Sequence, residues 1–174
     1  NSEHIWSQAP LRVCLIGHTG RGDYGHGLDT AWLTIPNVKL VAVADPVHTG
    51  LESAKKRLGI SRGYASYTEM LREERPDITC IAPRFVNEHY DMVVKSIENG
   101  TRAIYMEKPF CRNIKEANAI VTLCKKHRVK LAIAHRNRYH PAIKTIEKLI
   151  NDGQIGELIE IRGRGKEDHR RGAL

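Results

Sequence analysis

The sequence lacks the features that would indicate a membrane protein, a metal site or a disulfide framework. Its longest apolar runs are far too short to cross a bilayer, and it shows no signal-like apolar segment, internal repeat or low-complexity stretch. Its four cysteines form no CxxC pair and stand apart, at Cys14, Cys80, Cys111 and Cys124. We therefore expect free thiols, no metal and a reducing compartment. The cytoplasm is favoured, with export as the alternative because the sequence starts without Met.

Aromatic residues are also scarce, at 6% of the chain, which argues against the use of its positive charge to bind nucleic acid. Lysine and arginine number 28 against 20 acidic residues, and the net charge of +8 attracts phosphates, nucleotides or acidic partners. The basic clusters at 125–128, 136–138 and 169–171 form no aromatic-interleaved stripe, and no zinc-finger or helix-turn-helix pattern is present. We therefore expect no nucleic-acid partner. Nucleic-acid binding through the positive charge is the alternative, and its affinity would depend steeply on salt.

The chain contains instead a regular alternation of short apolar runs and amphipathic segments. Nearly continuous apolar runs, typical of strands buried on both faces, occur at residues 11–16, 38–44, 77–82, 103–106 and 129–134. Because the segments between them read as helices, the pattern predicts an α/β fold with a doubly wound parallel sheet of the Rossmann type. Residues 155–164 then alternate like an antiparallel strand, and this change of period marks the start of a second domain.

A glycine-rich turn follows the first predicted strand. In a GxGxxG frame Gly17 and Gly22 match, whereas position 19 is Thr and the next residue is Gly20. We expect the three glycines to let the backbone approach a pyrophosphate at a helix N-terminus, with the Thr19 hydroxyl as an extra donor. The helix itself is expected to begin between residues 24 and 27 and to carry Leu28, Ala31, Trp32 and Leu33.

Asp45 stands at the tip of the second predicted strand, 28 residues after Gly17. An acid in this position of a Rossmann unit holds the ribose 2′-hydroxyl of a dinucleotide. Since a carboxylate repels a 2′-phosphate, Asp45 predicts NAD rather than NADP. The competing role is an N-cap or Asx turn before Thr49.

Two more strand ends carry candidate site residues. Pro83 to His89 follow the third long strand, and His89 either hydrogen-bonds a cofactor or substrate or belongs to the first turn of the next helix. Glu107, Lys108 and Pro109 follow the fourth, in the crevice where open parallel sheets bind ligands. A poorly solvated lysine there can donate or accept a proton near neutral pH, and the proline restricts its backbone. The competing reading is an ordinary turn with a solvated ion pair.

Taken together, these motifs resemble the glucose–fructose oxidoreductase, inositol dehydrogenase and rhizopine-catabolism family (Gfo/Idh/MocA). The resemblance covers nearly all of residues 11–165. It is carried by the turn at 17–22, Asp45, the Glu-Lys-Pro triplet at 107–109 and two later stretches, 137–141 and 153–157. Two departures are the Thr at position 19, where the family usually has Gly, and the longer spacing between Pro83 and His89.

The resemblance implies a Rossmann domain with a bound nicotinamide dinucleotide, and a second α/β domain with an open, mainly antiparallel sheet that shapes a sugar pocket and mediates oligomerisation. It places Lys108 beside the nicotinamide and the substrate hydroxyl, as the catalytic residue. It puts Glu107, Pro109, Pro83 and His89 on the cofactor side and Arg138 near the interdomain cleft, against substrate.

These inferences divide the chain into an unstructured lead at 1–10, an NAD-binding domain at 11–136 and the beginning of a C-terminal domain at 137–174, whose remainder we expect to be missing. The predicted activity is hydride transfer between NAD, less favourably NADP, and a hydroxyl of a sugar, sugar derivative or cyclitol, by a homo-oligomer. One alternative is an NAD-assisted glycoside hydrolase or lyase, which would give no net NADH. Another is a non-catalytic nucleotide-binding protein.

Overall fold

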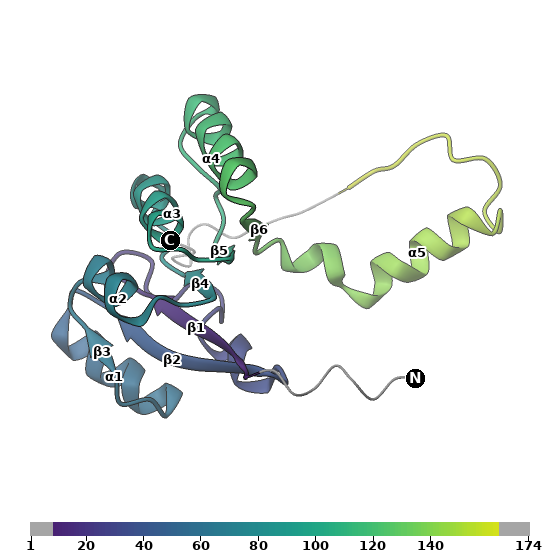
Figure 1. Cartoon of the computed structure of the whole chain (residues 1–174). Helices are drawn as coiled ribbons and strands as arrows, with labels where there is room; N and C mark the ends of the chain where they lie inside the picture. The colour runs from purple at the N-terminus through teal and green to yellow at the C-terminus, as the bar shows by residue number, and fades with distance from the viewer. Residues whose placement is uncertain (1–8, 164–174) are drawn as a thin grey trace. The chain divides into compact units, whose positions relative to one another are not determined.

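The computed structural model describes residues 9–163, and the chain divides after Ala134 into two compact units. The first unit contains the sheet and four α-helices (Figure 1). The second contains the short 3-10 helix η3 (Arg136–Tyr139) and helix α5 (Pro141–Asn151). No helix within the described ranges combines the length and the apolar character needed to span a bilayer.

The sheet has six strands in the order β3-β2-β1-β4-β5-β6, and every neighbouring pair is parallel. The strands are β1 (Leu11–Ile16), β2 (Val38–Ala44), β3 (Gly63–Tyr64), β4 (Ile78–Ile81), β5 (Ala103–Met106) and β6 (Lys130–Ile133). The direction of winding reverses between β1 and β4, which is the point where open α/β sheets bind ligands. The predicted doubly wound sheet is thereby confirmed.

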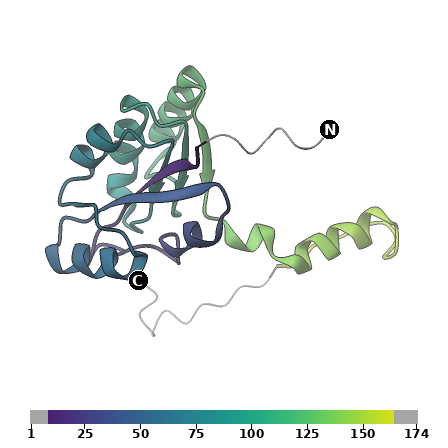
Figure 2. The ribbon, with the colours of Figure 1, turned by 60° about the horizontal axis from the view of Figure 1, so that its bottom comes forward.

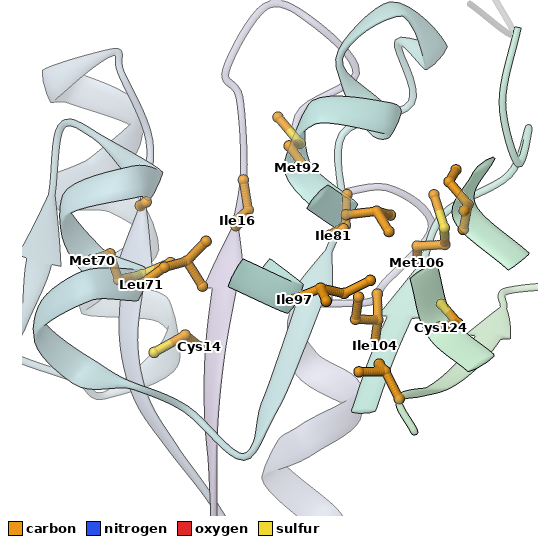
Figure 3. Close-up of a cluster of buried hydrophobic side chains, with 14 of the residues drawn as sticks. Cys14, Ile16, Met70, Leu71, Ile81, Met92, Ile97, Ile104, Met106 and Cys124 are labelled. Carbon is orange, nitrogen blue, oxygen red and sulfur yellow. The ribbon is translucent and has the colours of Figure 1, made fainter. Parts of the chain in front are cut away.

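The helices cover both faces of this sheet because successive strand residues point to opposite sides. Four α-helices belong to this unit: α1 (His48–Leu58), α2 (Tyr67–Glu74), α3 (His89–Glu98) and α4 (Ile114–His127). Side chains of α2, α3 and α4 form one core cluster with one set of strand residues (Figure 3). Helix α1 and the segment before β2 form the other, so the sheet lies between two layers (Figure 2).

The segment after the glycine turn differs from the prediction. Residues 24–29 form turns, and only a 3-10 helix, η1 (Thr30–Thr34), follows. The physical reason is backbone conformation: Gly20, Gly22, Asp23, Gly25 and Gly27 all have positive φ, which an α-helix does not tolerate.

Half of the predicted apolar face of that segment is nevertheless buried. Leu28 and Trp32 pack into the core with α1, as expected. Ala31 and Leu33 are exposed, because without an α-helix these positions do not share one face.

The predicted strand at 155–164 is also wrong for the residues that the structure describes. Residues 155–163 contain no strand, and Ile159 is 93% exposed; Arg164 lies outside the described residues. A strand needs a hydrogen-bonding partner, and nothing in the described part of the second unit supplies one. The antiparallel sheet of a second domain therefore stays a prediction.

Candidate functional site

Four strands end at the same edge of the sheet, and each is followed by a predicted site residue. Backbone bonds extend the strand ladder into these turns: Gly17 donates to Ala44, and Glu107 donates to Ile81, each over 2.8 Å. The carboxyl edge thus gathers the glycine turn after β1, Asp45 after β2, Pro83 after β4 and the triplet 107–109 after β5.

A cavity of about 290 Å³ opens at this edge. Gly17, Pro46 and Ser66 line it from the ends of β1, β2 and β3, and Glu88 lines it from the start of α3. Beside the cavity, Glu88 accepts from His18 Nδ1 at 3.0 Å and pairs with Arg21. A larger cavity, about 500 Å³, lies at the opposite edge of the sheet and is lined by none of the predicted site residues. Because parallel sheets bind ligands at their carboxyl ends, the smaller cavity is the candidate cofactor site.

Asp45 is fully buried, and its carboxylate is held by the chain itself. The Thr19 hydroxyl donates to Oδ2 over 2.6 Å and the Tyr24 hydroxyl over 2.7 Å, while the Thr19 amide lies 3.1 and 3.2 Å from the two oxygens. The amide of Val47 donates to Oδ1 over 2.9 Å, which forms the Asx turn named above as the competing role. Burial, and next its bond to Asp45, raise the pKa of Tyr24 well above its usual range.

The glycine turn is folded tightly onto the protein rather than left open. A Cβ on Gly17 would lie 2.2 Å from the Tyr24 ring, and a Cβ on Gly22 would lie 2.3 Å from the amide nitrogen of Arg84. Both glycines are therefore required by packing. Gly20 differs, because a Cβ there would meet no atom within 4 Å, although its amide already donates to Asp23 Oδ1 over 2.9 Å. The role of all three in pyrophosphate binding stays a prediction.

Glu107 is 1% exposed and is held through one oxygen only. His26 Nδ1 lies 2.5 Å from its Oε1, whereas Oε2 has no hydrogen-bond partner within the described residues. A buried acceptor without a donor costs stability, which marks Oε2 as a position where a ligand could donate. The neighbouring Lys108 is exposed, so the expectation that it is poorly solvated is wrong for this structure; the turn after β5 points it toward solvent instead of burying it. Its peptide bond to Pro109 is cis.

His89 ties the ends of β4 and β5 together. It is fully buried, with Nε2 2.7 Å from the carbonyl oxygen of Pro83 and Nδ1 2.8 Å from that of Pro109. Three predicted site residues are thus in direct contact, although both ring nitrogens of His89 face backbone carbonyls rather than open space. This hydrogen bond to Pro109 fixes the turn that carries Lys108 to the first residue of α3.

The remaining predicted residue, Arg138, lies in η3 of the second unit. Sequence reasoning missed two contributors to the carboxyl edge, Tyr24 and His26. The sequence indicates them only by their place in a glycine-rich segment, because such segments form turns and turns often carry functional side chains. Across residues 9–163 no group of three His, Cys, Asp or Glu side chains is close enough to hold a metal ion.

Comparisons with known proteins agree with this architecture. The family model described as "Oxidoreductase family, NAD-binding Rossmann fold" matches residues 11–135. The scyllo-inositol 2-dehydrogenase (NAD(+)) of Bacillus subtilis (strain 168) is 29% identical over 150 residues, which are 86% of this chain and 43% of that protein. The D-apiose dehydrogenase of Paraburkholderia graminis is 32% identical over 126 residues, 72% of this chain and 33% of that protein.

Among solved structures, myo-inositol 2-dehydrogenase from Lactobacillus plantarum superimposes with a TM-score of 0.75 at 28% identity, covering 86% of this chain and 43% of that one. The chain therefore spans less than half the length of these relatives. Since the family model covers most of the chain, the protein belongs to the Gfo/Idh/MocA oxidoreductase family, whose nicotinamide-cofactor domain has a Rossmann fold.

Proposed function

We propose that the protein is an NAD-dependent oxidoreductase that acts on a hydroxyl group of a sugar, a sugar derivative or a cyclitol. The observation that carries the proposal is the position of Lys108, an exposed lysine at the carboxyl edge of a parallel sheet. It stands between the buried Glu107 and Pro109, whose carbonyl is hydrogen-bonded to the buried His89. The names of the relatives, which act on inositol and apiose, support the substrate class.

The residues at the edge fit a dinucleotide in two places. The cavity of about 290 Å³ lies over the ends of β1, β2 and β3, where the adenosine half would bind. Glu107 Oε2, buried and without a donor, would accept from a hydroxyl or amide of the other half. Gly20, where a Cβ would meet no atom within 4 Å, leaves room for a ligand beside the glycine turn.

In the proposed mechanism the chain supplies orientation and proton transfer. A nicotinamide dinucleotide held at this edge would supply the acceptor for the hydride of the carbon that carries the hydroxyl group. Lys108 Nζ takes the proton of that hydroxyl as the carbonyl forms, and returns it in the reverse direction. The hydrogen bond between His89 Nδ1 and the Pro109 carbonyl holds the backbone of the turn from which Lys108 extends.

The test is turnover of NAD by the purified protein with a panel of cyclitols and sugars, in wild type and in Lys108→Ala. Loss of a general acid–base should lower kcat by about 100- to 10,000-fold. The control is Lys115→Ala, an exposed lysine in the first turn of α4, which should keep wild-type kcat. Near-normal turnover in Lys108→Ala would reject the proposed role, and conversion of a glycoside without net NADH would favour the hydrolase or lyase alternative.

Two further expectations belong to the same proposal. The protein is expected to form a homo-oligomer through its second domain, which light scattering on the purified protein would measure. It is expected in the cytoplasm, which fractionation of the source cells would check.

A further inference from the structure

The carboxylate that would select the cofactor is covered by the glycine turn. Asp45 Oδ2 accepts from the hydroxyls of Thr19 and Tyr24, and no part of the residue is exposed. A ribose hydroxyl that binds Oδ2 must therefore compete with these two side-chain donors. The Tyr24 ring is the harder one to move, because it packs against Gly17 and lies under the guanidinium of Arg57, 4.9 Å from the ring centroid.

The Thr19 side chain occupies a slot that a glycine of α1 leaves open. A Cβ on Gly50 would fall 1.8 Å from Thr19 Oγ1, 2.6 Å from Thr19 Cβ and 2.9 Å from Asp45 Oδ2. The slot is thus bounded by the first turn of α1 on one side and by the carboxylate on the other. Without the Thr19 side chain, it would present Asp45 to a group the size of a hydroxyl.

On the basis of the proposed cofactor site, we propose that Thr19 is a specificity-determining residue whose hydroxyl takes the place of the ribose 2′-hydroxyl on Asp45. Its effect is to weaken NAD binding and to reduce the preference for NAD over NADP. An uncovered carboxylate would accept a bond from the 2′-hydroxyl of NAD and repel the 2′-phosphate of NADP. Covered by Thr19, Asp45 favours NAD only through its buried charge.

This proposal and the sequence-based expectation for Thr19 predict opposite signs. If the Thr19 hydroxyl donates to the cofactor, its removal weakens binding. If it competes with the cofactor for Asp45, its removal strengthens binding of NAD in particular. A hydrogen bond to a charged acceptor changes affinity by about tenfold or more, so the two outcomes are well separated.

The experiment is a titration of NADH and NADPH, followed by nucleotide fluorescence, on wild type, Thr19→Ala and Thr19→Ser. We expect Thr19→Ala to bind NADH about tenfold more tightly and NADPH no more tightly. The Kd for NADPH divided by the Kd for NADH should therefore rise about tenfold. Thr19→Ser keeps the donor and should stay within about twofold of wild type. Thr19→Gly, which restores the usual family residue, is the second variant and should shift the ratio in the same direction as Thr19→Ala.

Weaker NADH binding in Thr19→Ala, or an unchanged ratio in both the alanine and glycine variants, overturns the role of Thr19 while leaving the cofactor site intact. Absence of NADH and NADPH binding in all four proteins, each shown to be folded by circular dichroism, overturns the cofactor site and the role of Thr19 together.

Discussion

The contact between Gly50 and Thr19 predicts that an ordinarily favourable substitution will destabilise this protein. Replacing a helical glycine by alanine usually stabilises by up to about 1 kcal/mol. Here the new Cβ would lie 1.8 Å from Thr19 Oγ1, so the threonine must leave its place on Asp45. The bond that is lost, 2.6 Å long and made to a buried carboxylate, is worth about 1.5–3 kcal/mol. Gly50→Ala should therefore lower the free energy of unfolding by about 1–2 kcal/mol.

The same substitution should behave differently when Thr19 is first changed to glycine. In that background the two closest atoms are gone, and Asp45 Oδ2, at 2.9 Å from the new Cβ, is the next nearest, which is still a tight approach. Gly50→Ala should then cost clearly less than in wild type, so the coupling energy between positions 19 and 50 is about 1–2 kcal/mol. Urea unfolding of wild type, the two single variants and the double variant, followed by circular dichroism, measures this cycle. A coupling energy within about 0.5 kcal/mol of zero would refute the reasoning.

Two other predictions concern buried side chains of the first unit. Burial raises the pKa of the Cys14 and Cys80 thiols to about 12. Alkylation of the native protein at mildly alkaline pH should therefore modify the partly exposed Cys111 first. Peptide mass spectrometry measures the rates, and a comparable rate of alkylation at Cys14 would contradict this prediction. Tyr24→Phe removes a donor to the buried Asp45 and should cost about 1.5–3 kcal/mol in urea unfolding. Because the pKa of Tyr24 is raised in the folded protein, its contribution is fully present below about pH 10 and lost above it, so stability should fall less steeply there in Tyr24→Phe.

The layers of the fold follow from patterns that act over a few residues. Continuous apolar runs identified the long strands, because strands of a parallel sheet are buried on both faces. The start of α4 likewise depends on neighbouring residues, because Asn113 Oδ1 accepts from the Glu116 amide over 3.0 Å and so caps the helix. Family membership followed from the same local motifs in their order along the chain, and the family model confirms it.

The features that the sequence did not predict depend on contacts between distant segments. The glycine turn at 17–22 was expected to lead into a helix that begins between residues 24 and 27, yet the positive φ angles of Gly25 and Gly27 prevent that helix. Asp45 was expected to face a cofactor, but Thr19 and Tyr24 reach it only because the glycine turn folds back over the end of β2. Periodicity carries no information about such a fold-back.

The central claim is that a nicotinamide dinucleotide binds at the carboxyl edge of the sheet. The most direct measurement is a titration of the isotope-labelled protein with NADH, in which backbone amide chemical shifts report where the ligand lies. We predict saturable changes concentrated at the glycine turn, at residues 45–50, around Ser66 and at the turn after β5. Absence of saturable changes, or changes confined to the opposite edge around Arg102 and Arg128, would contradict the account.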